Sequence, residues 1–109
     1  MSKLKEYKMF IGGEWVESES KKTFETLNPE NNQPWAKVPE ANAKDVDKAV
    51  KAAQKAFEGE WSKLLPRDRA KFLRAIGQKL RDNAKLLGEI ETIDTGKLFR
   101  ETNKQANYI

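Results

Sequence analysis

The longest regular pattern of apolar and polar positions runs from Pro66 to Gly96. Its apolar residues recur at steps of three and four, which stacks their side chains on one face of a helix. These residues are Leu73, Ile76, Leu80, Ala84, Leu87 and Ile90. Pro66 suits a first helical position, and Gly96 can adopt the left-handed conformation that ends helices. The sequence therefore places a residue suited to begin a helix at one end of the pattern and a residue suited to end a helix at the other.

One interruption divides this stretch. Asp82 and Asn83 break the apolar run, and the side chain of an Asn can cap the N–H groups of a new helical turn. The pattern therefore predicts two consecutive helices, over residues 66–82 and 84–95, with Asn83 capping the second.

The first forty residues are typical of strands. Gly12-Gly13 separates two short apolar runs, and both positions of such a tight turn need a positive φ, which glycine adopts freely. A second pair of strand-like segments lies over residues 23–39, with Asn and Pro residues forming the turn between them. We expect two β-hairpins over residues 8–38, approximately.

A further helix is predicted over residues 43–58. Asn42 is suited to cap it, and Asp45 stands in the first turn, where the helix dipole favours an acidic residue. Gly59 ends the helix, and an apolar linker follows. The expected buried face consists of Val46, Ala49, Val50, Ala53 and Phe57.

Residues 100–109 resemble the start of one more helix. This segment ends on Tyr108 and Ile109 without a glycine, a proline or a basic last turn. We therefore expect the natural polypeptide to continue beyond it.

Composition restricts the chemistry of the chain. Its 109 residues allow at most one small domain, and they include neither Cys nor His. Disulfides, Cys nucleophiles, His bases and zinc sites with Cys or His ligands are therefore excluded within this sequence.

With no apolar run long enough to span a membrane and no signal peptide, the expected location is the cytoplasm. A charged content of 35% with a net charge of +4 is typical of a mixed, solvated surface.

The segment Asp94-Thr95-Gly96-Lys97 resembles part of a phosphate-binding loop. That motif needs a second glycine where Glu91 stands and Ser or Thr where Leu98 stands, and its helix follows the glycines instead of preceding them. We interpret the segment as the end of a helix. The nearby acidic residues fit an exposed helix face better than a catalytic pair.

The helix over residues 66–82 has a basic side that raises the alternative of nucleic-acid binding. This side consists of Arg67, Arg69, Lys71, Arg74, Lys79 and Arg81. Asp68 and Asp82 dilute its positive charge, and no sequence motif of a nucleic-acid-binding fold accompanies it.

Five motifs in order resemble the N-terminal portion of the NAD(P)-dependent aldehyde dehydrogenase superfamily. They cover nearly the whole chain: Phe10-Ile11-Gly12-Gly13-Glu14-Trp15-Val16, Leu27-Asn28-Pro29, Asp45-Val46-Asp47-Lys48-Ala49-Val50 with Ala56-Phe57, Trp61, and Glu91-Thr92-Ile93-Asp94-Thr95-Gly96-Lys97. Leu98 departs from the pattern, because many members have proline there. The resemblance implies an α+β segment that belongs to the α/β cofactor-binding domain of the aldehyde dehydrogenase fold.

The same resemblance implies what this chain lacks. Members of the superfamily oxidise an aldehyde to an acid with a catalytic cysteine, a glutamate base, an asparagine oxyanion donor and a dinucleotide fold, all beyond Ile109. We therefore expect NAD or NADP in the parent enzyme, no cofactor for this chain alone, and no catalytic or cofactor-binding residue within it. Some members bind a monovalent cation through main-chain oxygens at the positions of Leu27 and Asp94, which are the candidate metal ligands.

Three hypotheses follow for the function. The first is an inactive N-terminal segment of an aldehyde dehydrogenase, whose partner is the remainder of the enzyme. The second is a small module that binds nucleic acid through its basic helix. The third is a fragment that self-associates through exposed apolar helix faces, including the stripe between residues 66 and 96.

Overall fold

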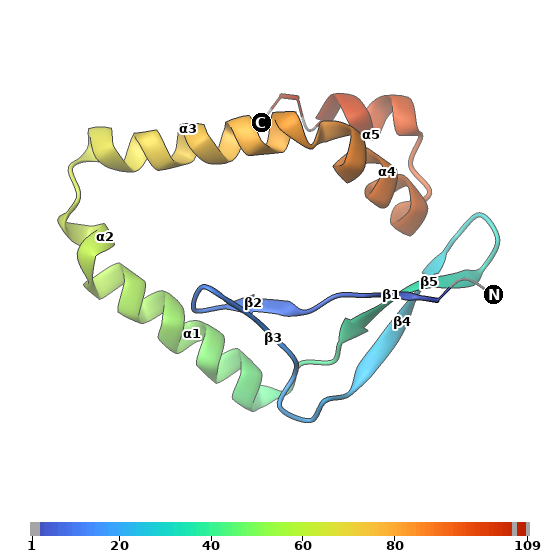
Figure 1. Cartoon of the computed structure of the whole chain (residues 1–109), viewed down its shortest axis with the longest axis horizontal. Helices are drawn as coiled ribbons and strands as arrows, with labels where there is room; N and C mark the ends of the chain where they lie inside the picture. Colours follow the sequence, from blue (N-terminus) through green and yellow to red (C-terminus); the bar gives the residue numbers. More distant parts are fainter. Residues whose placement is uncertain (1–2, 106, 109) are drawn as a thin grey trace. The chain divides into compact units, whose positions relative to one another are not determined.

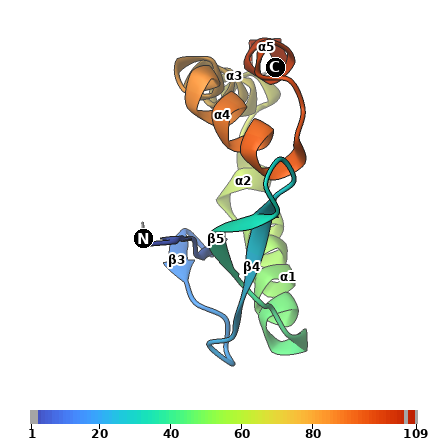
Figure 2. The ribbon, with the colours of Figure 1, turned by 90° about the vertical axis from the view of Figure 1, so that its right-hand side faces the viewer.

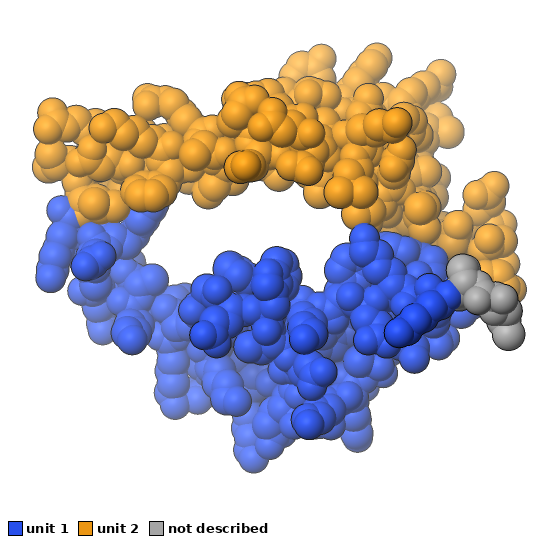
Figure 3. All heavy atoms as spheres, viewed as in Figure 1, with its two compact units in different colours: residues 1–27, 34–63 blue, residues 28–33, 64–109 orange. Residues whose placement is uncertain are grey.

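The computed structural model describes residues 3–105, 107 and 108, and it has an α+β architecture in which strands precede helices (Figure 1). The chain divides into two compact units (Figure 3). The first comprises Met1–Leu27 with Pro34–Lys63, and the second comprises Asn28–Gln33 with Leu64–Ile109. The expected order of two hairpins followed by helices is confirmed.

The first hairpin joins β2 (Met9–Ile11) to β3 (Glu14–Val16). The two strands are antiparallel, with Phe10 opposite Trp15. Both turn glycines have positive φ, 61° at Gly12 and 83° at Gly13. The Gly-Gly pair therefore adopts the conformation that its sequence predicts.

The second hairpin joins β4 (Thr23–Asn28) to β5 (Gln33–Pro39). Its turn is held by Asn28, whose main-chain oxygen accepts a hydrogen bond from the Asn32 N–H at 2.7 Å and whose side chain accepts one from the Glu30 N–H at 2.9 Å. Asn32 has a φ of 56°, which Asn tolerates better than most residues. The turn chemistry of the Asn-rich segment thus explains the reversal.

One strand was not predicted. β1 (Lys5–Glu6) pairs with β5 in parallel, so the order of the three-stranded sheet is β1-β5-β4. The Tyr7 N–H extends this pairing by donating to the Lys37 oxygen at 3.0 Å. The Tyr7 ring meets Trp35 edge-on at 6.1 Å between centroids. Among the apolar residues of this unit that the structure describes, only Ala36 is buried.

The three main helices have the predicted bounds. They are α1 (Ala43–Glu58), α3 (Pro66–Asp82) and α4 (Ala84–Thr95). Two short helices complete the chain: α2 (Glu60–Lys63), where the sequence predicted a linker, and α5 (Phe99–Gln105). The last helix was expected over residues 100–109, and part of that range, residues 106 and 109, lies outside the described residues.

Two details of the prediction were wrong. Asn83 lies between α3 and α4, yet its side chain does not cap α4; instead its amide donates back to the Lys79 oxygen at 2.9 Å. On α1, Val46, Val50 and Phe57 are exposed, the last to 69%. The side of α1 near the first hairpin carries small residues, Ala49 and Ala52, instead.

Candidate functional site

The end of α4 carries the motif that most resembles a ligand-binding loop. Gly96 has a φ of 78°, and its N–H donates to the Thr92 oxygen at 2.9 Å. The amine of Lys97 forms an ion pair with Glu91 at 2.8 Å. The glycine N–H and the lysine are thus engaged within the chain, which supports the interpretation as a helix end rather than a phosphate cradle.

A small pocket of about 460 Å³ adjoins this helix end. It is lined by Pro29, Glu30, Thr92, Gly96, Lys97, Leu98 and Phe99. A Cβ added at Gly96 would lie 3.1 Å from the Pro29 Cγ, so glycine permits a close contact here as well as the left-handed backbone. The helix end and the turn of the second hairpin therefore form one local structure.

The two predicted cation ligands lie in different elements. Leu27 is exposed within β4, and Asp94 is exposed near the end of α4. They belong to different compact units, and the cation site stays a prediction. Separately, no cluster of three or more acidic side chains is placed to hold a metal ion within the described residues.

A buried threonine joins α4 to α5, which lie side by side in Figures 1 and 2. Thr102 is only 1% exposed, and its hydroxyl donates to the Gly88 oxygen at 3.0 Å and lies 3.0 Å from the Thr92 hydroxyl. Gly88 leaves room for this contact, because a Cβ there would lie 2.9 Å from the Asn103 main-chain nitrogen. This junction could not be predicted from the sequence, since neither Thr102 nor Gly88 belongs to a recognisable motif.

A second side-chain junction fixes the start of α1. Asn42 and Asp45 form a reciprocal capping box, in which each side chain accepts from the other residue's main-chain N–H. Asp45 is 3% exposed, and it also accepts from the Glu19 N–H at 2.9 Å. The carboxylate thus anchors α1 to the connection that follows the first hairpin.

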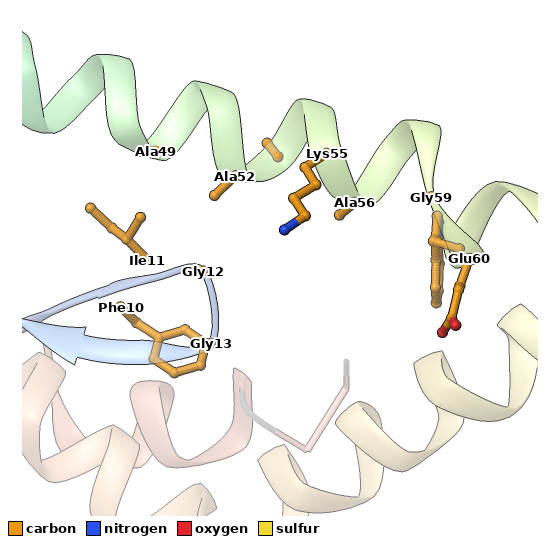
Figure 4. A pocket seen from close by; sticks show the side chains of 12 residues that line it. Phe10, Ile11, Gly12, Gly13, Ala49, Ala52, Lys55, Ala56, Gly59 and Glu60 are labelled. Carbon is orange, nitrogen blue, oxygen red and sulfur yellow. The ribbon is translucent and has the colours of Figure 1, made fainter.

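A larger pocket of about 980 Å³ lies between the first hairpin and the helices α1 and α2 (Figure 4). Ile11 from the hairpin and Ala52 from α1 face each other across it. Lys55 and Glu60 are its only charged lining residues, and its other lining residues are apolar or glycine. The pocket lacks the set of convergent polar groups that would orient a small molecule.

Three of the six residues in the apolar stripe of α3 and α4 are exposed. Leu73 and Ile76 are exposed to 63% and 55%, and Leu87 to 37%, whereas Ala84 is buried. Leu73, Ile76 and Leu87 are therefore not covered by the described part of the chain.

The basic side of α3 is partly engaged within the chain. Arg69 donates to the Leu64 oxygen, and Lys71 forms an ion pair with Asp68 at 3.5 Å. Arg81 donates to the Gln78 side chain at 3.1 Å. The Lys71–Asp68 ion pair offsets one positive charge of this side, whereas the two arginine contacts are to neutral oxygens and leave the charge in place.

Comparisons with known proteins show a family and several related proteins. The family model described as "Aldehyde dehydrogenase family" matches residues 15–109. An aldehyde dehydrogenase from Aspergillus niger is 46% identical over 89 residues, which cover 82% of this chain and 18% of that protein. The chain thus spans between a tenth and about a fifth of the length of the relatives that it matches.

Solved structures give the same result at the level of the fold. The structure of a point mutant of betaine aldehyde dehydrogenase from Staphylococcus aureus, in complex with NAD⁺, matches 92% of this chain and 20% of its own chain. The TM-score is 0.87 and the identity 39%. An NAD-dependent aldehyde dehydrogenase from Sinorhizobium meliloti matches 96% of this chain and 21% of its own, with a TM-score of 0.92 and 27% identity. These comparisons do not support the nucleic-acid or self-associating alternatives.

Proposed function

The chain belongs to the aldehyde dehydrogenase family, and we propose that it forms the N-terminal part of the cofactor-binding domain of an NAD(P)-dependent aldehyde dehydrogenase. The parent reaction is the oxidation of an aldehyde to a carboxylic acid with hydride transfer to NAD⁺ or NADP⁺. The observation that carries the proposal is the match of residues 15–109 to the family together with the fold shared with NAD⁺-bound relatives.

The chain alone is proposed to be inactive. It contains no Cys, so the nucleophile that the resemblance implies would come from the remainder of the enzyme. The Gly96-Lys97 segment is engaged with Thr92 and Glu91, and it offers no phosphate cradle for a dinucleotide. The cofactor would accordingly be held by the remainder of the enzyme.

Two finer features belong to the same proposal. Main-chain oxygens of Leu27 and Asp94 would help to bind a monovalent cation in the assembled enzyme. The remainder of the enzyme would be the principal partner. Among the described helices, none combines the length and apolar character that crossing a bilayer requires. The expected compartment of the parent enzyme is the cytoplasm.

A chimeric enzyme tests the proposed function. This chain would replace the matched N-terminal portion of the Staphylococcus aureus betaine aldehyde dehydrogenase, and NADH formation would be followed with betaine aldehyde and NAD⁺. We expect activity from the chimera, and none from the 109-residue chain or from the Staphylococcus aureus polypeptide that lacks its N-terminal portion. A chimera that folds, as judged by circular dichroism and gel filtration, but produces no NADH would contradict the proposal.

A test of the cation proposal uses the same chimera. Its activity and thermal stability would be compared in Na⁺, K⁺ and a bulky organic cation at equal ionic strength. Higher stability in one of the two alkali cations is expected, and equal stability in all three salts would refute the site.

A further inference from the structure

A polar pocket of about 370 Å³ lies within the first compact unit. Three segments line it: residues 6–8, the connection from β3 to the start of β4, and β5. Its volume is in the range of sites that hold small molecules. None of its lining residues belongs to the five motifs that the sequence shares with the aldehyde dehydrogenase family. The proposed function therefore leaves this pocket unexplained.

Basic side chains outnumber acidic ones in the wall of the pocket. Its charged lining residues are Lys8, Lys21, Lys22 and Lys37, with Glu6 and Glu17. None of the four amines forms an ion pair within the described part of the chain. Lys37 is half-buried in β5, where a cation without a countercharge is unfavourable. The excess of positive charge favours an anionic ligand.

Hydrogen bonds fix the turn that carries two of these lysines. Ser18 is 4% exposed, and its hydroxyl donates to the Lys22 oxygen at 3.1 Å. The Lys21 N–H donates to the Ser18 oxygen, and the Glu40 N–H donates to the Lys22 oxygen, both at 2.9 Å. Lys21 has a φ of 59°, which is uncommon for a residue with a Cβ. The turn is thus held in one conformation, so little entropy is lost when a ligand binds to it.

Tyr7 adds an unused hydrogen-bonding group to the same wall. Its hydroxyl oxygen is buried and has no hydrogen-bond partner among the described residues. Such atoms are rare in folded proteins, because a buried polar group without a partner is unfavourable. The Lys5 amine lies 5.1 Å from the centroid of the Tyr7 ring and adds a further positive charge beside the pocket. A hydroxyl donor in this surrounding is suited to an oxyanion.

The type of cation in the wall narrows the class of anion. Arginine binds planar carboxylates through two parallel hydrogen bonds, and no arginine lines this pocket. Lysine amines act as point charges, and they bind phosphate from several directions. A phosphate group carries up to two negative charges and has several acceptor oxygens, so several amines can contact it at once.

We propose that the four lysines of this pocket, together with Tyr7, form a binding site for a doubly charged phosphate group. The group is either free phosphate or the end of a small phosphomonoester. This inference goes beyond the proposed function, because it adds a second ligand to a part of the chain for which the oxidation of an aldehyde needs none.

A titration with inorganic phosphate tests the site. The isotope-labelled 109-residue chain would be followed by the NMR shifts of its backbone amides, at constant ionic strength so that screening does not change. We expect saturable shifts at Tyr7, Lys22 and Lys37, and none in α4. The same titration would be made by calorimetry on the chimera described above, with saturating NAD⁺ to keep phosphate out of the cofactor site.

Paired substitutions assign the binding to the pocket. Lys8→Gln combined with Lys37→Gln removes two amines from different segments of the wall, and we expect the affinity for phosphate to fall at least about tenfold. Lys48→Gln combined with Lys51→Gln is the matched control, because it removes the same charge from exposed positions of α1 that do not line the pocket. The control should bind phosphate within about twofold of the natural chain.

Tyr7→Phe tests the hydroxyl, since it removes one oxygen and keeps the ring. We expect the affinity for phosphate to fall about tenfold, as for the loss of a hydrogen bond to a charged group. An unchanged affinity would contradict the assignment of Tyr7 to the site.

Glycerol phosphate distinguishes the two sources of the phosphate group. Tighter binding of glycerol phosphate than of inorganic phosphate would support a phosphomonoester as the ligand, and equal or weaker binding would support free phosphate.

Three outcomes would overturn the site. They are no saturable binding at phosphate concentrations on the order of 10 mM, equal affinities of the Lys8→Gln/Lys37→Gln variant and its control, and binding to the isolated chain that is absent from the folded chimera. Activity is not the readout, so an active chimera that does not bind phosphate would refute the site and leave the proposed function standing. A folded, inactive chimera that binds phosphate would do the reverse.

Discussion

At the scale of single residues, Asp45 joins two segments that lie far apart in the sequence. Its carboxylate accepts hydrogen bonds from the Glu19 and Asn42 N–H groups, both at 2.9 Å. Asp45→Ala would leave these donors without their acceptor, and we expect the unfolding free energy to fall by about 1–2 kcal/mol. Urea unfolding followed by circular dichroism measures this loss.

Asp47 provides the matched control for Asp45. Its carboxylate hydrogen-bonds Lys51 at 2.7 Å and raises the pKa of that amine above its ordinary value, through this hydrogen bond first and charge attraction second. Both side chains are exposed, and exposed ion pairs contribute little to stability. Asp47→Ala should therefore destabilise the chain much less than Asp45→Ala. Equal losses for the two variants would show that Asp45 does not anchor α1.

Thr102 supplies a second prediction at this scale. Thr102→Val keeps the shape of the side chain but removes the hydroxyl that contacts the Gly88 oxygen and the Thr92 hydroxyl. We expect a loss of about 1–3 kcal/mol, because the Thr92 hydroxyl would then lose its partner at a buried junction. Thr95→Val is the control, since that hydroxyl is exposed and its two hydrogen bonds, to the Glu91 oxygen and from the Lys97 N–H, are local to the end of α4. A stability equal to that of the natural chain would contradict the assigned role of Thr102.

These residues differ in how visible they are in the sequence. Asn42 and Asp45 follow a spacing that local capping rules recognise, so the start of α1 could be predicted. The hydrogen bond from the Glu19 N–H to Asp45 could not be predicted, because it depends on how the tertiary fold brings two distant segments together. Thr102 gives no local signal either, since its burial results from the packing of α5 on α4.

At the scale of elements, Gly88 sets the approach of α5 to α4. In an isolated helix, Gly→Ala stabilises by about 1 kcal/mol. Here the new Cβ would meet the Asn103 nitrogen at 2.9 Å and its Cα at 3.0 Å, and both atoms belong to the main chain. We therefore expect Gly88→Ala to destabilise the chain by about 1–3 kcal/mol, as overpacking does. Urea unfolding decides between the two effects by the sign of the change in the free energy of unfolding. A stabilised variant would show that α5 does not pack closely on α4.

Helix bounds and buried faces were predictable to different degrees. The bounds of α1, α3 and α4 depend on local features such as Pro66 and Gly96, and these features are readable in the sequence. The face of α1 was assigned wrongly because an apolar stripe shows that a face is apolar, not that this chain covers it. β1 was missed because its two residues form a parallel pair with a distant strand, which leaves no alternating pattern.

At the scale of the whole molecule, each compact unit buries few residues completely. Among the described residues, the buried apolar side chains are Ala36 in one unit and Ala84 in the other, whereas many large apolar side chains remain exposed. Examples are Phe57 and Val50 on α1 and Leu73 on α3. Because exposed apolar patches mark interaction surfaces, this distribution supports a segment that is completed by further polypeptide. The chemistry that the family implies also depends on further polypeptide, since it needs a nucleophile that this chain lacks.

Dye binding provides the corresponding prediction for the whole chain. An environment-sensitive dye such as anilinonaphthalene sulfonate should fluoresce strongly with the isolated 109-residue chain, because it binds uncovered apolar surface. Ile76→Asp combined with Val50→Asp should weaken this signal, since the two changes place a charge on each of the two exposed helix faces. The chimera with the Staphylococcus aureus polypeptide should give a much weaker signal per molecule, because the same surfaces would be covered there. A dark isolated chain with native circular dichroism would show that its apolar faces do not form accessible patches, and the argument for a missing partner would then fail.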